Sequence, residues 1–223
     1  MNPYLAELND FTFTRLARLL ADVSPPAGLK PINLSIGEPK HPTPQFIRDA
    51  IGQNTAGLAQ YPPTKGPLAL RQTIADWIKR RFHLPALDAE TQVLPVLGTK
   101  EALYSFTQTV IDPTGQRPTV LVPNPFYMVY EGAALLCGAK PFFVNFDAAA
   151  GEYAWDAVPQ SVWQDVQLLI VCSPDNPTGA ITNRERWRWL FEQSDRYGFV
   201  ILADECYSEI YFDEGNPPVG ALQ

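Results

Sequence analysis

The sequence predicts an α/β fold in which a mostly parallel sheet is flanked by helices, with an N-terminal arm before it. From residue 91 onward, apolar runs of strand length alternate with segments of helix length, which is the pattern of repeated βα units. Runs such as LLIV and FVIL are continuously apolar, as expected for strands that are covered on both faces. The 22 prolines cluster between these segments, where they mark the loops of a large domain.

The first sixty residues predict helices separated by long loops. Apolar residues at helical spacing predict a helix over 10–23, with Asp10 or Thr12 as its N-cap. The turn-rich stretch that follows leaves room only for a short strand over 32–36, and residues 44–52 predict a short helix.

A longer helix is predicted over 67–82, with Pro67 in the first turn, where proline is tolerated. We expect residues 1–45 to form an N-terminal arm with part of a small domain, and residues 46–223 to form the large domain. The final stretch GNPPVGALQ is loop-like and contains no closing helix or strand, which predicts a truncated domain.

The rest of the chain predicts alternating strands and helices. Strands are expected in TQVLPVLG, PTVLVPNP, AKPFFVNF, VQLLIVCSP and FVILADE, and helices in GTKEALYSFTQTVI, FYMVYEGAALLCG and NRERWRWLFEQSDRYG. Ligands of parallel sheets bind at the carboxyl ends of the strands. Polar residues gather at these ends, at 98–100, at Asn124, at 173–179 and at Asp204, so this edge is the candidate site.

Composition excludes several classes of function. The net charge of −7 and the lack of a basic stripe argue against a nucleic-acid partner. No apolar run approaches the roughly 20 residues that span a bilayer, so no membrane partner is expected. Cys137, Cys172 and Cys206 form no CxxC pair, and two of them lie in apolar runs (LLIVCSP and VILADEC), which predicts buried free thiols in a reducing, cytoplasmic setting.

Common catalytic and metal motifs are missing from the sequence. It contains no GxGxxG, P-loop, GxSxG or HExxH pattern. The two histidines, His41 and His83, are far apart in sequence, so neither a histidine-based triad nor a metal site is expected.

Two turns of the predicted edge carry residues suited to an anionic ligand. Gly98-Thr99-Lys100 stands where a strand meets a helix, and a helix N-terminus attracts phosphate; the alternative is a glycine needed only by the backbone. In SPDNPTG, residues 173–179, two prolines hold Asn176, whose amide can donate to a ligand oxygen. The alternative is an Asx-turn in which this asparagine bonds its own backbone.

A carboxylate and two aromatic rings complete the candidate site. Asp204 ends a buried strand, where a carboxylate is costly without a partner, so a cation is expected beside it; a protonated pyridine nitrogen would serve. The alternative is a helix-capping aspartate. Tyr207 lies three residues later, and Tyr127 in PNPFYMVY could stack on a flat cofactor, although core tyrosines are the alternative for both.

The order and spacing of these motifs resemble the class I/II aminotransferases of pyridoxal-phosphate (PLP) fold type I, from LSIGEP to the end of the chain. The stretches SIGEPKHPTP and QYPPTKGPLALRQTIADW are most similar to bacterial succinyldiaminopimelate aminotransferases of lysine biosynthesis. The resemblance implies a fold type I large domain, incomplete here, and an enzyme that binds PLP. It implies transfer of an amino group from N-succinyl-LL-2,6-diaminopimelate to 2-oxoglutarate, in a cytoplasmic homodimer when full length.

The resemblance also implies roles for individual residues. Backbone N–H groups of Thr99 and Lys100 would bind the phosphate, and Tyr127 would stack on the pyridine ring. Asp204 would pair with the ring nitrogen, and Asn176 and Tyr207 would contact the phenolic oxygen. The remaining expected contacts are the phosphate with Tyr61 of the partner subunit, and the substrate with Gly37 and Asn176.

The sequence departs from the family at the lysine that should hold PLP. The family places this lysine after Asp204, whereas all six lysines precede it: Lys30, Lys40, Lys65, Lys79, Lys100 and Lys140. We therefore expect no catalytic residue in this chain, and poor solubility or no transamination when residues 1–223 are expressed alone. The alternatives are another fold type I reaction, such as a carbon–sulfur β-lyase, and an inactive fragment.

Overall fold

A computed structural model describes residues 1–30 and 32–223, which form two compact units. Residues 9–64 form one unit, and residues 1–8 together with 65–223 form the other. The predicted boundary between an arm over 1–45 and a large domain over 46–223 remains a prediction.

The unit of residues 9–64 is built from helices and extended loops. It contains α1 (Thr12–Leu20), α2 (Gln45–Gln53) and the 3-10 helix η2 (Thr55–Ala59), so both predicted helices are confirmed. The predicted N-cap of α1 is wrong: Phe11 occupies that position, and Asp10 instead accepts a hydrogen bond from Arg18 at 2.6 Å. The possible strand over 32–36 does not form.

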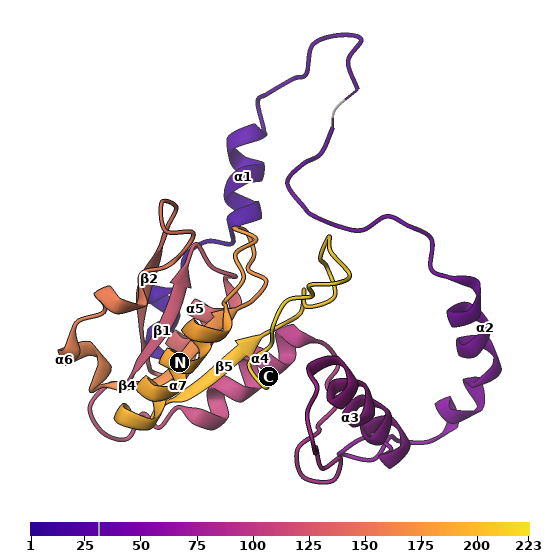
Figure 1. Ribbon diagram of the computed structural model, residues 1–223. Helices are drawn as coiled ribbons and strands as arrows, with labels where there is room; N and C mark the ends of the chain where they lie inside the picture. The colour runs from indigo at the N-terminus through magenta and orange to yellow at the C-terminus, as the bar shows by residue number, and fades with distance from the viewer. Residues whose placement is uncertain (31) are drawn as a thin grey trace. The chain divides into compact units, whose positions relative to one another are not determined.

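The larger unit contains a five-stranded sheet in the order β3-β2-β1-β4-β5 (Figure 1). The strands are β1 (Thr119–Asn124), β2 (Lys140–Asp147), β3 (Glu152–Tyr153), β4 (Val166–Cys172) and β5 (Val200–Asp204). Neighbouring strands among β2, β1, β4 and β5 are parallel, and only β3 runs antiparallel, against β2. The predicted α/β fold with a mostly parallel sheet is confirmed.

The helices of this unit are η1 (Pro3–Glu7), α3 (Leu68–Phe82), α4 (Thr99–Val110), α5 (Val129–Leu136), η3 (Trp155–Ala157), α6 (Gln160–Trp163) and α7 (Arg184–Tyr197). The sequence predicts the four longest, α3, α4, α5 and α7, and does not predict the short helices η1, η3 and α6. The expected strand in TQVLPVLG, residues 91–98, does not form. Within the described sheet no strand lies beside this segment, so its backbone groups lack the ladder that would make it a strand.

The two faces of the sheet bury separate cores, because alternate residues of a strand point to opposite sides. Val120 and Val122 of β1 pack with residues of α4 and α5, whereas Leu121 of the same strand packs with Trp187 and Leu190 of α7. The sheet is therefore covered on both faces, which explains the continuously apolar strands and leaves its carboxyl edge as the place for polar residues.

No helix of the described residues is long and apolar enough to cross a membrane.

Candidate cofactor-binding site

The carboxyl ends of β4 and β5 bring two predicted segments side by side. Cys172 and Asp204 are register partners at the ends of these parallel strands. The N–H of Ser173 donates to the Asp204 carbonyl at 3.0 Å, so the SPDNPTG turn starts directly beside Asp204. The sheet register thus assembles segments that lie thirty residues apart in the sequence.

Asp204 is a buried carboxylate whose partners are neutral. Its side chain is only 7% exposed. Oδ2 accepts from the Tyr130 hydroxyl at 2.7 Å, and Oδ1 accepts from the Cys206 N–H at 3.3 Å. None of the ion pairs formed by residues 1–30 and 32–223 includes Asp204. A buried carboxylate in this state favours a cationic N–H, and a protonated pyridine nitrogen fits that requirement.

The buried Tyr130 is a site residue that the sequence reasoning missed. It lies on α5, and burial raises the pKa of its phenol, with nearby Cys172 and Asp204 adding to the effect. The hydroxyl therefore stays protonated and donates to the carboxylate. The available signal was its position in PNPFYMVY, three residues after Tyr127 and inside the segment predicted to be a helix.

The variant Tyr130→Phe is expected to lower the free energy of unfolding by about 1–3 kcal/mol, because a buried carboxylate loses a hydrogen-bond donor. Urea denaturation of wild type, Tyr130→Phe, Asp204→Asn and the double variant measures the coupling. We expect the cost of Tyr130→Phe to shrink in the Asp204→Asn background. An unchanged cost would show that the hydroxyl stabilises the protein independently of Asp204.

Asn176 and Tyr207, which the sequence predicts to share one ligand atom, lie within hydrogen-bond distance of each other. The Asn176 amide Nδ2 donates to the Tyr207 hydroxyl at 3.4 Å. Asn176 is exposed and Tyr207 is half-buried, so both polar ends remain accessible. A ligand oxygen placed between them could accept from both groups.

The start of α4 provides the anion-binding end of the site. Gly98 is its N-cap with φ of 139°, a conformation that favours glycine, and Thr99 and Lys100 open the first turn. A hollow of about 460 Å³ between α4 and β5 is lined by both Thr99 and Asp204. The free N–H groups of a helix N-terminus suit a phosphate, and this end of α4 lies at the same hollow as Asp204.

Tyr127 lies next to the Asp204 hydrogen bond. Its ring packs edge-on against Tyr130, with 5.8 Å between ring centroids. Tyr127 is half-buried, and its ring also contacts the core beneath α5.

Gly37 and Tyr61 belong to the other unit, residues 9–64, and both are exposed. The substrate contact of Gly37 and the contact of Tyr61 with a partner subunit's cofactor therefore remain predictions.

Both thiols nearest Asp204 hold their protons at neutral pH. Burial raises the pKa of Cys172 to about 11, and partial desolvation of the Cys206 thiol together with the nearby charge of Asp204 raises the pKa of Cys206 to about 12. The prediction of a buried thiol is confirmed for Cys172 and wrong for Cys206, which is exposed because it lies in the turn beyond the end of β5. Since the thiolate is the nucleophilic form, neither cysteine is poised to react.

The variant Glu205→Gln is expected to become progressively more stable than wild type between pH 4 and pH 7. Burial raises the pKa of the Glu205 carboxyl, despite the hydrogen bond from the Ala221 N–H at 2.6 Å. The folded protein then holds this proton more tightly than the unfolded chain. Stability is therefore lost as pH rises from the unfolded pKa, about 4.3, through the folded one.

Urea denaturation at several pH values measures the difference in the free energy of unfolding between Glu205→Gln and wild type. Glu192→Gln, at an exposed position, is the matched control. A difference between Glu205→Gln and wild type that stays constant over this range would contradict the expected titration.

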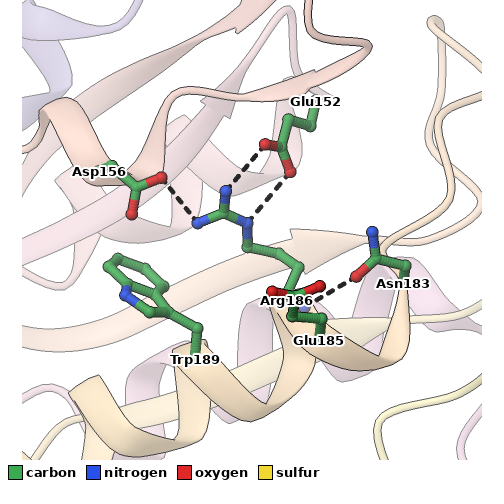
Figure 2. A pocket seen from close by; sticks show the side chains of 6 residues that line it. All are labelled: Glu152, Asp156, Asn183, Glu185, Arg186 and Trp189. Carbon is green, nitrogen blue, oxygen red and sulfur yellow. Dashed lines mark hydrogen bonds and ion pairs between the residues drawn. The ribbon is translucent and has the colours of Figure 1, made fainter.

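A separate polar pocket lies between the β3 hairpin and α7 (Figure 2). Its volume is about 310 Å³, and it is lined by Glu152, Asp156, Asn183, Glu185, Arg186 and Trp189. Arg186 pairs with Glu152 at 2.8 Å and with Asp156 at 3.0 Å, so its charge is neutralised within the pocket. No group of three or more His, Cys, Asp or Glu that could hold a metal occurs among the described residues.

Comparison with known proteins agrees with this geometry. The family model for aminotransferase class I and II matches residues 30–221. An LL-diaminopimelate aminotransferase of Desulforudis audaxviator is 34% identical over 96% of this chain and 54% of its own length.

Solved structures show the same relationship. An aminotransferase from Neisseria meningitidis is 46% identical, with a TM-score of 0.94 over the whole of this chain and 56% of its own. The N-succinyldiaminopimelate aminotransferase of Mycobacterium tuberculosis is 26% identical, with a TM-score of 0.81, over 99% of this chain and 56% of its own. The chain thus spans about half the length of these relatives. The family match over residues 30–221 and the similarity to these relatives show the family: the chain belongs to the class I and II aminotransferases.

Proposed function

We propose that the protein is a PLP-dependent aminotransferase and that this chain supplies the residues that bind the cofactor. The buried Asp204 carries the proposal, because it lacks a cationic partner among the described residues and lies at the edge of the sheet where ligands bind. The Asn176–Tyr207 pair and the N-terminus of α4 support it, since they offer donors for an oxygen and for a phosphate.

Each residue has a distinct role in this proposal. Bound PLP supplies an aldehyde that takes up the amino group and a ring that accepts electrons from the substrate Cα. Asp204 holds a proton on the ring nitrogen, and Asn176 and Tyr207 donate to the phenolic oxygen. Backbone N–H groups of Thr99 and Lys100 hold the phosphate, and Tyr127 stacks on the ring. None of the six lysines follows Asp204, so we assign no proton-transfer residue to this chain.

The proposed substrate is an amino acid with the diaminopimelate skeleton, and the proposed acceptor is 2-oxoglutarate. The names of the relatives support the skeleton but differ in detail, since one acts on LL-diaminopimelate and another on the N-succinyl compound. We propose the N-succinyl compound, as the sequence predicts. We also propose a cytoplasmic homodimer in which Tyr61 and Gly37 complete the site.

Two measurements test the function. Quenching of tryptophan fluorescence should report saturable PLP binding by the purified protein, weakened in Asp204→Asn and Asn176→Ala. Coupled assays of the full-length protein with 2-oxoglutarate should then show glutamate formed in equal amount to the amino donor consumed, with N-succinyl-LL-diaminopimelate and LL-diaminopimelate compared directly.

Failure to bind PLP would overturn the proposal. Release of ammonia and a 2-oxo acid without any glutamate would replace it with a lyase reaction.

A further inference from the structure

The turn that carries Asn176 is built over a buried carboxylate with no role in the proposed function. Asp175 is 6% exposed and directly precedes Asn176. Its Oδ2 accepts from the Thr178 hydroxyl at 2.5 Å and from the Thr178 N–H at 3.1 Å. Two backbone hydrogen bonds of 2.9 Å, from Gly179 N–H to the Asp175 carbonyl and from Asp175 N–H to the Ala180 carbonyl, close the same turn. Asp175 therefore stabilises the turn through hydrogen bonds of both its side chain and its backbone.

A tyrosine from a distant strand reaches this carboxylate. The Tyr153 hydroxyl lies 2.9 Å from Asp175 Oδ2 and 3.2 Å from the Pro125 carbonyl oxygen, and it donates to the nearer carboxylate. Burial raises the pKa of the Tyr153 phenol, and the contact with Asp175 raises it further, so the proton remains available for this bond. The turn after β4 is thereby tied to β3, which is not its neighbour in the sheet.

Tyr153 is itself held from two sides. Its ring packs against Phe146 and Trp155, with centroid distances of 5.3 and 5.7 Å. The preceding residue, Glu152, binds the guanidinium of Arg186 through both carboxylate oxygens, at 2.8 and 3.1 Å (Figure 2). The hydroxyl is thus presented to Asp175 by a strand that is fixed to α7.

Asn176 is an exposed residue of the turn that Asp175 and Tyr153 stabilise. Its backbone follows Asp175 directly, whereas its amide reaches the Tyr207 hydroxyl at 3.4 Å, close to the long limit for a hydrogen bond. A small rotation of the turn would break that contact, because the geometry is already at the edge of what the bond tolerates. The direction of the amide depends on the position of the turn.

We propose that Tyr153 and Asp175 are positioning residues that aim the Asn176 amide at the atom it shares with Tyr207. The buried hydrogen bond between Tyr153 and Asp175 fixes the position of the turn, and the position of the turn fixes the direction of the Asn176 amide. This inference rests on the proposed function, in which that atom is the phenolic oxygen of PLP.

The first test needs no ligand. Tyr153→Phe removes only the donating hydroxyl, and Tyr197→Phe is the matched control, since Tyr197 packs against the same core from the end of α7. Amide hydrogen exchange should speed up about tenfold at Thr178, Gly179 and Ala180 in Tyr153→Phe and remain as in wild type in Tyr197→Phe. Unchanged exchange at all three amides in Tyr153→Phe would overturn the inference, whatever the protein binds.

The second test asks whether the hydrogen bond between Tyr153 and Asp175 affects PLP binding through Asn176. PLP dissociation constants are measured for wild type, Tyr153→Phe, Asn176→Ala and the double variant, together with the pH midpoint of the absorbance of bound PLP. We expect Tyr153→Phe to weaken binding roughly tenfold and to move the midpoint toward that of Asn176→Ala, with no further effect in the double variant.

The outcomes separate this inference from the proposed function. If Asn176→Ala weakens PLP binding and Tyr153→Phe does not, the positioning role is wrong and the proposed site stands. Equal weakening by Tyr153→Phe in both backgrounds also overturns the role, because the hydroxyl then acts on stability alone. If wild type binds no PLP, the proposed function fails, and with it the role of aiming the amide at a cofactor.

Discussion

Asp204→Asn is expected to weaken PLP binding on the order of 100-fold, since a charge-assisted hydrogen bond to the ring nitrogen becomes a neutral one. In the full-length protein, transamination should fall further than binding, because an unprotonated ring is a poor acceptor for the electrons of the substrate Cα. The amide has nearly the shape of the carboxylate and can still accept the Tyr130 hydroxyl. Fluorescence titration with PLP measures the loss.

The fold should survive this change, which makes the result interpretable. A buried charge without a cation is costly, so the neutral amide is expected to leave the free energy of unfolding unchanged or to raise it. Asp195→Asn, on the exposed side of α7, is the matched control and should bind PLP as wild type does. Normal PLP affinity in Asp204→Asn would contradict the pairing of this carboxylate with the ring nitrogen.

Trp163→Ala is expected to lower the free energy of unfolding by about 3–5 kcal/mol. The side chain is 5% exposed and stacks on Tyr197 and Phe199, at centroid distances of 5.8 and 5.5 Å. Its indole N–H also donates to the Val158 carbonyl at 3.1 Å. Alanine would leave a large cavity under α7 and an unsatisfied carbonyl. Urea denaturation followed by circular dichroism measures the loss.

Trp77→Ala on α3 provides the comparison, because Trp77 is 40% exposed and its main ring contact is Phe82. We expect it to cost less than half as much. Similar losses at the two positions would show that the aromatic cluster around Trp163 does not form part of the cooperative core.

The helices and strands were predictable where the apolar pattern was complete. α3 and α7 agree closely with the sequence pattern, and α7 carries its own boundary signals, with Asn183 as N-cap and Gly198 after its last residue. The segment TQVLPVLG shows the limit of such patterns. It has the composition of a strand, but a strand also requires neighbours for its backbone, and sequence composition does not report them.

The candidate site was predictable in its residue types but not in its contacts. Asp204, Asn176 and Tyr207 stood out because each polar residue follows an apolar strand or a proline-rich turn. Tyr130 did not stand out, since a tyrosine on an amphipathic helix usually packs in the core. Its hydrogen bond to Asp204 joins residues 74 positions apart, and only the packing of α5 against the sheet creates it.

The sequence alone therefore determined the fold class, the edge of the sheet where the candidate residues gather, and the chemistry that their side chains offer. The tertiary structure decided which of those side chains are in contact. The sheet register placed the SPDNPTG turn beside Asp204, and the pairing of β3 with β2 placed Tyr153 within hydrogen-bond distance of Asp175. The physical reason is that apolar periodicity is a local property that a short window of residues displays. A hydrogen bond between buried polar groups depends instead on the positions of elements that are distant in the chain.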